Sequence, residues 1–303
     1  MSKTIRIGTR DSQLALWQAN TVKSRLEALG YKTELVSVKS TGDLVLDKPL
    51  YELGITGIFT KTLDVAMLNG SVDIAVHSMK DVPTLLPKGI VQTAVLERAS
   101  SQDILVTKGQ PNFQDPCTIA TGSLRRKAQW LHRYPNHQLV GLRGNVNTRL
   151  QKLNESPWQG AIFAKAGLER IQVLPENYIS LDWMVPAPAQ GAMVVVALEN
   201  DPYCQEATRQ LNVTNTQVCT HIEREFLRVL EGGCTAPIGA IATINGVKVH
   251  FKGVLFSLDG QTKLEVEQST HRDAYDSFGR KCALHLLSVG GKELMAAIKK
   301  EMS

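Results

Sequence analysis

Two separate stretches of this chain share one order of local signals, and this repetition constrains the fold more than any other feature. Residues 5–19 read IRIGTRDSQLALWQA and residues 118–131 read TIATGSLRRKAQWL. Each begins with a short apolar run typical of a buried strand, passes through a tight polar turn and continues with helical periodicity. Asp11 or Ser12 can cap the first helix and Ser123 the second, because their side-chain oxygens accept from free helical N–H groups. The pattern predicts two α/β lobes of similar architecture.

The chain is expected to pass between these lobes twice. A linker with two prolines, residues 185–191, precedes the apolar run 192–198, which we predict to return to the first lobe as a strand. A chain that crosses twice between lobes forms a hinged cleft. Domain 1 is therefore predicted to comprise residues 1–96 plus about 192–211, and domain 2 residues 99–186.

Residues 214–303 are predicted to form a third domain, small and of the α+β class. A helical stripe from Val218 to Leu230 is followed by three alternating strands, with hairpin turns at Asn245-Gly246 and Asp259-Gly260. Helices over about 273–287 and about 292–302 close the chain. The length of 303 residues accommodates three domains of this kind.

Composition narrows the class of protein. Apolar residues make up 43% and charged residues 21% of the chain, as in ordinary soluble proteins. No apolar run reaches the ~18 residues of a membrane span, and the start MSKTIRIGTR holds no apolar signal segment, so we expect a cytoplasmic protein without membrane association. The five cysteines include no CxxC pair, and no histidine–carboxylate spacing suggests a metal, so we expect neither disulfides nor a metal site. A net charge of +5 without a basic stripe interleaved with aromatics argues against nucleic-acid binding.

A polar and charged segment, HSMKDVPT over residues 77–84, directly follows the apolar pattern of residues 72–76. Pro83 ends regular structure, so His77, Ser78, Lys80 and Asp81 should gather at the carboxyl end of a strand, where α/β sheets bind ligands. Asp81 could stabilise a cationic intermediate as a lone carboxylate, or form a structural ion pair with Lys80 or an arginine, and the pattern favours neither. Lys80 could form a Schiff base, but a charge partner is the favoured interpretation.

Five arginines lie where helices disfavour them. Arg125 and Arg126 occupy the first turn of a predicted helix, Arg10 precedes another, and Arg143 and Arg149 flank the start of a third. A cation at a helix N-terminus opposes the helix dipole by roughly 0.3–1 kcal/mol, so several together require an anion. Helical N–H groups and guanidinium groups both suit carboxylates, and no turn fits the phosphate-binding pattern GxxxxGK[ST]. A ligand with several carboxylates is the favoured interpretation, and scattered surface arginines are the alternative.

Cys234 differs from the other cysteines, because two glycines precede it and a proline follows soon after, which predicts a loop tip. It also follows a helix C-terminus, whose dipole disfavours a thiolate. We therefore expect a thiol that traps a strong electrophile rather than an unassisted nucleophile. The remaining cysteines are interpreted as small buried hydrophobes: Cys117, Cys204, Cys219 and Cys282.

Six blocks of sequence together resemble the porphobilinogen deaminase family, also called hydroxymethylbilane synthases. They are TRDSQLALWQA (9–19), HSMKDVPT (77–84), TGSLRRKAQ (121–129), LRGNVNTRL (142–150), AQGA (189–192) and EREFLRVLEGGCTAPIGA (223–240). The blocks follow the order of the family and span nearly the whole chain. HSMKD, SLRR and EGGC-x-x-PIG together are specific, whereas TR and RGN alone are weak.

The resemblance implies two lobes related to type II periplasmic binding proteins, followed by a third domain. It implies an enzyme that condenses four porphobilinogen molecules head to tail into linear hydroxymethylbilane, releasing ammonia at each step of this tetrapyrrole synthesis. It also implies a dipyrromethane cofactor held through a thioether, at Cys234 in this sequence. Deaminated porphobilinogen is an azafulvene electrophile, which a modest thiol can capture. We expect a monomer whose partner is the small molecule porphobilinogen.

The resemblance also implies roles for individual residues. Asp81 and Lys80 would be catalytic, with Asp81 assisting proton transfer and stabilising pyrrole-nitrogen cations. The arginines would hold acetate and propionate groups. The residues implied to bind the cofactor are Cys234, Arg125, Arg126, Ser123, Thr121, Ser78, Lys80, Asp81, Arg143 and Gly144. Those implied to bind substrate are Arg10, Arg143, Arg149, Gln18 and Arg170.

The sequence departs from the family pattern at a few positions. Glu52 and Thr56 stand where lysines are usual, which weakens any charge clamp from the loop around residues 53–59. Asn147 replaces a frequent glycine, a change that the tolerance of Asn for positive φ would accommodate. Two further alternatives therefore stay open: a non-catalytic binder of an organic polyacid, and a family member that has lost its activity.

Overall fold

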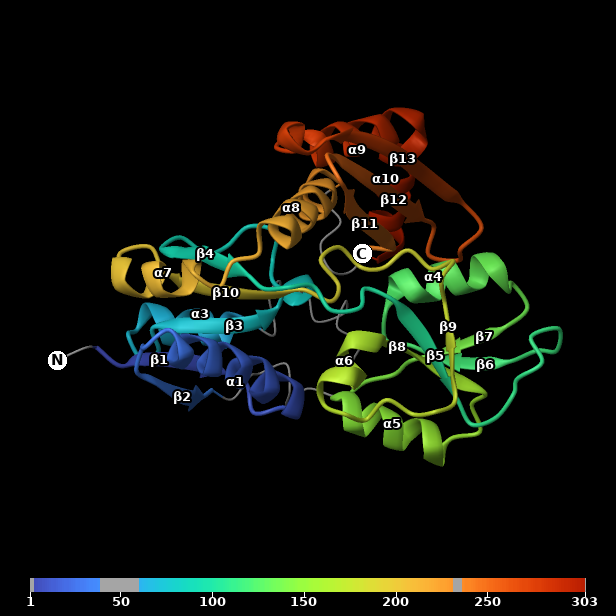
Figure 1. Ribbon diagram of the computed structural model, residues 1–303. Coiled ribbons are helices and arrows are strands. Elements are labelled where there is room, and N and C mark those ends of the chain that lie inside the picture. Colours follow the sequence, from blue (N-terminus) through green and yellow to red (C-terminus); the bar gives the residue numbers. More distant parts are fainter. Residues whose placement is uncertain (1–2, 39–59, 231–235, 303) are drawn as a thin grey trace.

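The computed structural model describes residues 3–38, 60–230 and 236–302. Its described strands form two five-stranded sheets and one three-stranded sheet. In Figure 1 the first five-stranded sheet lies at the left, the second at the right, and the three-stranded sheet above them. We call these sheets with their helices the first lobe, the second lobe and the third domain.

The first lobe is built on a mixed sheet in the order β2-β1-β3-β10-β4. β1 pairs in parallel with β2 and β3, whereas β10 lies antiparallel between β3 and β4. The strands are β1 (Ile5–Thr9), β2 (Thr33–Ser37), β3 (Ile74–Ser78), β4 (Ile90–Val95) and β10 (Met193–Leu198). The predicted return of the chain to this sheet as a strand is confirmed.

Helices cover both faces of this sheet because each turns an apolar stripe toward it. The helices are α1 (Gln13–Ala28), α3 (Lys61–Leu68) and α7 (Pro202–Arg209). α1 and α7 share a core with Ile7 on one face, whereas Leu63 and Met67 of α3 pack into a separate core with Ala75 on the other. Ser12 caps α1, since its hydroxyl accepts from the N–H of Ala15.

The second lobe repeats this topology with one change in chain order. Its sheet runs β7-β6-β8-β5-β9, with β6 parallel to β7 and β8, and β5 antiparallel between β8 and β9. The strands are β5 (Asp103–Thr107), β6 (Thr118–Ala120), β7 (Gln138–Val140), β8 (Gly160–Ala164) and β9 (Tyr178–Ser180). β5 thus corresponds to β10, so the antiparallel strand comes first in this lobe and last in the other. The shared plan predicted from the sequence is confirmed.

Side-chain caps start the first two helices of the second lobe. The helices are α4 (Leu124–Arg133), α5 (Val146–Glu155) and α6 (Lys165–Arg170). Ser123 accepts from the N–H of Arg126 at 3.4 Å, and Asn145 accepts from the N–H of Thr148 at 2.9 Å. These caps fix where the two arginine-bearing helices begin.

The third domain packs helices against an antiparallel sheet in the order β11-β12-β13. The elements are α8 (Thr214–Val229), β11 (Ile238–Asn245), β12 (Lys248–Phe256), β13 (Lys263–His271), α9 (Phe278–Leu286) and α10 (Lys292–Met302). Val218, Ile222, Phe226 and Leu230 of the predicted stripe are all buried in its core. The helix predicted over about 273–287 begins later, at Phe278, because residues 272–274 form a short 3-10 turn.

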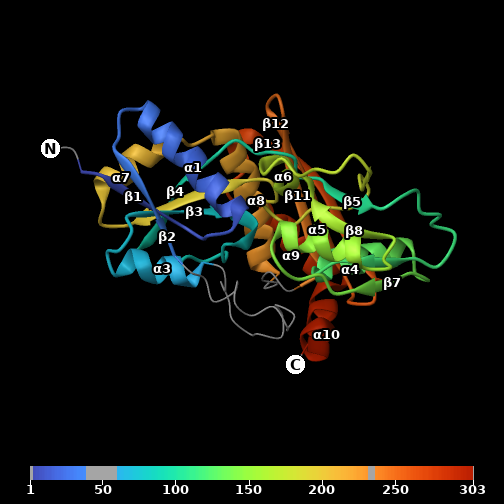
Figure 2. The ribbon, with the colours of Figure 1, turned by 90° about the horizontal axis from the view of Figure 1, so that it is seen from below.

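α8 joins the third domain to both crossovers between the lobes. Glu223 of α8 is fully buried and binds the guanidinium group of Arg98, at 2.6 Å and 3.0 Å. Its carboxylate also accepts from the N–H groups of Ala189 and Ala242. Arg98 follows β4 and Ala189 precedes β10, so one carboxylate ties together both connecting segments and β11. In Figure 1 α8 lies above the inner part of the first lobe, and Figure 2 shows the two lobes on either side of it.

Within the described residues, no helix combines the length and apolar character needed to cross a bilayer.

Candidate active site

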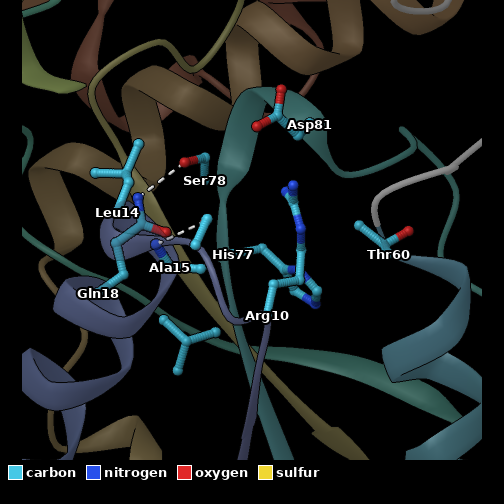
Figure 3. Close-up of a pocket in the computed structure, with 10 residues that line it drawn as sticks. Arg10, Leu14, Ala15, Gln18, Thr60, His77, Ser78 and Asp81 are labelled. Carbon is cyan, nitrogen blue, oxygen red and sulfur yellow. Dashed lines mark hydrogen bonds between the residues drawn. The ribbon is translucent and has the colours of Figure 1, made fainter. Parts of the chain in front are cut away.

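A pocket lies at the carboxyl end of β3, where the strand passes into the 3-10 turn Met79–Asp81. Its lining includes Arg10, Gln18, His77, Ser78 and Asp81. Figure 3 shows these side chains around one space, contributed by α1, the turn after β1, and β3 with its turn. The prediction that polar residues of HSMKD gather at a strand end is confirmed, although His77 and Ser78 belong to the strand itself.

Gln18 and His77 form an uncharged part of the pocket wall. Gln18 is 2% exposed, and its Nε2 donates to Ser78 Oγ at 2.8 Å. His77 is 6% exposed, and its Nε2 has no hydrogen-bond partner in the described part of the chain. Burial, helped by the charge of Arg10, lowers the pKa of His77 to about 4. The imidazole is therefore neutral near pH 7.

Asp81 is half-buried, and its carboxylate has neither an ion pair nor a hydrogen bond among the described residues. The structural ion pair with Lys80 or an arginine considered from the sequence is thus not formed. Lys80 instead donates from Nζ to Oε1 of Gln190 at 3.3 Å. Burial, together with the charge of Arg126, lowers the pKa of Lys80 to about 8. Lys80 therefore carries a positive charge near pH 7 that a modest rise in pH removes.

Asp103, at the start of β5, supplies the anion that Arg125 and Arg126 require. Arg125 Nη2 lies 2.7 Å from one carboxylate oxygen of Asp103, and Arg126 Nη2 donates to the other at 2.7 Å. Burial alone would raise the pKa of Asp103, but the two guanidinium charges outweigh it and hold the pKa below its usual range. The positions of these two arginines in the helix therefore do not by themselves demand a ligand, which corrects the inference drawn from the dipole.

Arg143 and Arg149 bring positive charge to the turn before α5, and neither forms an ion pair with a carboxylate among the described residues. Arg143 Nε is buried and has no hydrogen-bond partner among the described residues. Arg149 Nε donates to the carbonyl oxygen of Gly144, whose φ of +113° suits glycine. Burial and the charges of Arg126 and Arg143 lower the pKa of Arg149 to about 10. An anion between these two cations would reduce their repulsion, and the polycarboxylate ligand expected from the sequence stays a prediction.

Thr121 and Ser123 lie in the turn between β6 and α4. Thr121 Oγ1 accepts from the N–H of Ser123 at 3.3 Å, and Ser123 caps the helix. Asn147, in the first turn of α5, adopts a helical conformation, so the expected need for positive φ falls on Gly144 instead. Asn147 Nδ2 donates to Gln13 Oε1 at 2.8 Å, a contact between the two lobes.

Gln190 was not singled out from the sequence, yet it connects the charged groups. It is fully buried, and its Nε2 donates to Asp103 at 2.9 Å and to the carbonyl oxygen of Ser101 at 2.8 Å. Its Oε1 accepts from Lys80, so one amide links the end of β3 to the start of β5. A polar side chain between alanine and glycine in an otherwise apolar linker was the signal available. Asp103, a charge opening an apolar strand, gave a similar signal.

Arg170 does not join this group. It lies with Trp17 in a second pocket beside the crossovers, where its guanidinium carbon stands 5.5 Å from the indole centre. Arg170 Nη2 donates to the carbonyl oxygen of Gly191 at 2.7 Å. Burial lowers the pKa of Arg170 to about 10. Trp17 and Gln18 are neighbours on α1, so this helix separates the two pockets.

Some predicted site residues lie outside the described residues: Cys234, Glu52 and Thr56. The other cysteines, Cys117, Cys204, Cys219 and Cys282, are all buried, in agreement with the interpretation of them as small hydrophobes. Across residues 3–38, 60–230 and 236–302, no three histidine, cysteine or acidic side chains cluster as a metal would require.

Solved structures with a similar arrangement include periplasmic binding proteins. The probable amino-acid ABC transporter extracellular-binding protein of Bacillus subtilis is 11% identical with a TM-score of 0.42, over 70% of this chain and 90% of that one. A periplasmic binding protein of Salmonella typhimurium is 12% identical with a TM-score of 0.40, over 69% of this chain and 92% of that one.

Comparisons of the amino-acid sequence give matches at much higher identity, over nearly the whole chain. A family model described as "Porphobilinogen deaminase, dipyromethane cofactor binding domain" matches residues 5–206, and one described as "Porphobilinogen deaminase, C-terminal domain" matches residues 217–288. The porphobilinogen deaminase of Pelobacter propionicus is 39% identical over 302 residues, covering 98% of this chain and 97% of that protein. That of Campylobacter concisus is 38% identical over 302 residues, covering 97% of each. The chain therefore belongs to the porphobilinogen deaminase family.

Proposed function

We propose that this protein condenses four porphobilinogen molecules head to tail into hydroxymethylbilane, with release of ammonia at each step. The observation that carries the proposal is Asp81, a half-buried carboxylate that forms no ion pair among the described residues and lines the same pocket as Arg10. Porphobilinogen has an acetate, a propionate and an aminomethyl group. Arginines suit its carboxylates, and Asp81 suits the positive charge that develops on its pyrrole ring.

The described residues fit a dipyrromethane cofactor, whose pyrroles carry acetate and propionate groups. The buried Nε of Arg143 has no hydrogen-bond partner among the described residues, and burial together with neighbouring cations lowers the pKa of Arg149, so bound carboxylates would satisfy both. The residues proposed to hold the cofactor are Arg125, Arg126, Ser123, Thr121, Ser78, Lys80, Asp81, Arg143 and Gly144, with Cys234 forming the thioether. Arg149 is proposed to bind a carboxylate of the substrate. When bound, this group supplies the pyrrole carbon nucleophile that starts the chain.

Asp81 assists the substrate as its leaving group departs. The C–N bond of the substrate breaks, the protonated aminomethyl nitrogen leaves as neutral ammonia, and the methylene carbon becomes cationic through conjugation with the pyrrole nitrogen. An ionised Asp81 near that nitrogen stabilises the charge. The acceptor pyrrole would supply the free carbon for the new C–C bond, and the proton that this carbon loses would end on the ammonia as ammonium. Asp81 is placed to relay that proton.

The remaining site residues are proposed to position substrate. Arg10 and Gln18 line the pocket with Asp81, and Arg10 pairs with a substrate carboxylate. Arg170, in the second pocket, is also proposed to bind substrate, and its Nη2 holds the carbonyl oxygen of Gly191 in the crossover. We also propose a cytoplasmic monomer without nucleic-acid or membrane partners. Its proposed domains are residues 1–96 plus about 192–211, residues 99–186 and residues 214–303. The mild net charge of +5 supports the absence of a nucleic-acid partner.

Intact-mass spectrometry of the denatured protein, before and after incubation with porphobilinogen, tests the proposed function. We expect a covalent increment equal to two condensed, deaminated porphobilinogen units, and none in Cys234→Ala. A protein that gains no mass even after incubation, and releases no ammonia, would instead be a binder of organic polyacids.

Substitution of Asp81 tests its role in the reaction. Asp81→Asn should leave the circular dichroism and melting temperature unchanged but lower kcat by about 100-fold or more, because proton relay and cation stabilisation are both lost. Asp115→Asn, at an exposed carboxylate, is the matched control and should turn over normally. Normal product formation by Asp81→Asn would exclude a catalytic role.

A further inference from the structure

Arg224 of α8, in the third domain, donates hydrogen bonds to the turn that carries Asp81, in the first lobe. Its Nη1 donates to the carbonyl oxygens of Met79 at 3.1 Å and Val82 at 2.9 Å, and its Nη2 donates to that of Pro83 at 2.6 Å. The carbonyls held by one guanidinium group thus stand on both sides of Asp81 in the chain.

The start of the turn is held to the crossover, where the N–H of Met79 donates to the carbonyl oxygen of Ala192 at 3.0 Å, and the side chains of Met79 and Val82 are buried. Met79–Asp81 is a single 3-10 turn, closed by a 3.2 Å hydrogen bond from the N–H of Val82 to the carbonyl oxygen of Met79. Pro83 has no N–H to offer, so this end of the turn cannot continue into regular hydrogen bonding. The planar guanidinium group of arginine matches several acceptors in a fixed geometry, which an ammonium group does not. Arg224 holds the carbonyl groups of Val82 and Pro83, on the C-terminal side of Asp81, so it contributes to the direction in which Asp81 points.

The backbone that carries Arg224 is itself held in place. Its neighbour Glu223 is fully buried and binds Arg98 together with the N–H groups of Ala189 and Ala242. Adjacent residues of one helix thus bind the crossovers and the Asp81 turn. Any shift of α8 relative to the first lobe would move the carboxylate of Asp81.

We propose that Arg224 is a positioning residue that sets the carboxylate of Asp81 for the condensation, so that the third domain controls the geometry of a site in the first lobe. This inference rests on the proposed function, because it assigns Arg224 a role in that reaction. It differs from a purely structural role in what it changes: the rate of the chemical step in folded, cofactor-loaded protein, rather than the amount of such protein.

The test compares wild type with Arg224→Gln, Arg224→Lys and the control Arg228→Gln. Arg228 lies one helical turn further along α8, is exposed, and makes only a 3.9 Å ion pair with Glu225. Melting temperature and intact mass give the folded, loaded fraction, and rates with porphobilinogen are expressed per loaded molecule. We expect Arg224→Gln to lose about 100-fold in kcat with KM unchanged, since a misplaced carboxylate affects the transition state rather than binding.

Arg224→Lys should recover part of the lost kcat, because its ammonium can reach some of the carbonyls, and Arg228→Gln should match wild type. If Arg224→Gln does not fold, the kcat of Arg224→Lys decides: a reduced kcat at unchanged KM supports the proposal, and a wild-type kcat overturns it. The proposal is also overturned if total activity falls only in proportion to the fraction of protein that carries the cofactor, so that the rate per loaded molecule equals that of wild type. Wild-type protein that neither gains the cofactor nor turns over porphobilinogen would contradict the proposed function itself. Active wild type with equally active Arg224 variants would contradict only the role proposed for Arg224.

Discussion

At the scale of single residues, buried charges are balanced within the protein in one part of the site and left available in another. Asp103 is fully buried and forms ion pairs with both Arg125 and Arg126, so these charges hold β5 and α4 together. Arg143 has a buried Nε without a partner, and Asp81 has no bound cation, within the described residues. Because desolvated charges need partners, this difference separates the residues that build the site from those open to substrate.

His77 makes the stability of the protein depend on pH. Its folded pKa of about 4 lies below the ordinary 6.5 of an unfolded histidine, so between these values the unfolded chain binds more protons. The stability present above pH 6.5 is therefore lost as the pH falls toward 4, by up to about 3 kcal/mol. We expect the free energy of unfolding of His77→Gln, measured by urea denaturation, to fall less steeply over this range.

The exposed His250 provides the control for this experiment. His250→Gln should keep the pH dependence of wild type. Parallel curves for wild type and His77→Gln between pH 4 and 6.5 would mean that His77 takes up its proton in the folded state as easily as in the unfolded one.

The sequence predicted residues that act together only where they are close in the chain. His77, Ser78 and Asp81 share one strand end, so their meeting followed from local pattern. Asp103 and Gln190 meet their partners across long chain separations, which no local periodicity encodes. The anion for the arginines of α4 was therefore sought in a ligand rather than in the protein.

At the scale of elements, caps and turns were the most predictable features. Ser12 and Ser123 cap their helices, and Gly246 and Gly260 occupy hairpin turns with positive φ, because these signals act within a few residues. The prediction of where β3 starts was less accurate. Asp73 falls in the apolar run but precedes the strand, and it binds Arg6 of β1 through a bidentate ion pair. The hydrophobic periodicity of one segment cannot predict an ion-pair partner that lies on another strand.

Gly191, in the crossover before β10, gives a prediction at this scale. Its φ is +86°, and an added Cβ would lie 2.6 Å from the carbonyl oxygen of Ala99 and 2.7 Å from that of Ser100. Gly191→Ala should therefore force the two crossover segments apart and lower the free energy of unfolding by several kcal/mol in urea denaturation.

Gly30→Ala is the matched control, because Gly30 has a φ of +89° but no atom within 4 Å of an added Cβ. It should show only the backbone penalty of about 1 kcal/mol. Equal losses in the two variants would mean that the crossovers separate without resistance.

At the scale of the whole molecule, the buried carboxylate of Glu223 in the third domain binds both segments that connect the two lobes. Removing one partner of a buried ion pair typically costs about 3–5 kcal/mol, since the other charge remains buried. Glu223→Gln should therefore destabilise the protein by that amount and split a single calorimetric unfolding transition into separate ones. Glu206→Gln, on the exposed side of α7, is the control. A single transition at the wild-type temperature would show that other contacts hold the parts together.

The central position of β10 has a consequence for how the protein is made. This strand lies between β3 and β4, yet the whole second lobe is translated before it. While the ribosome is still extending the chain through the second lobe, β3 and β4 have no strand between them, and their open edges invite pairing with other chains. The second lobe, whose strands are contiguous in sequence, can close its sheet first. The N-terminal lobe, although synthesised earlier, is thus the later of the two to complete its sheet, and nascent chains halted before residue 193 are the ones most exposed to aggregation.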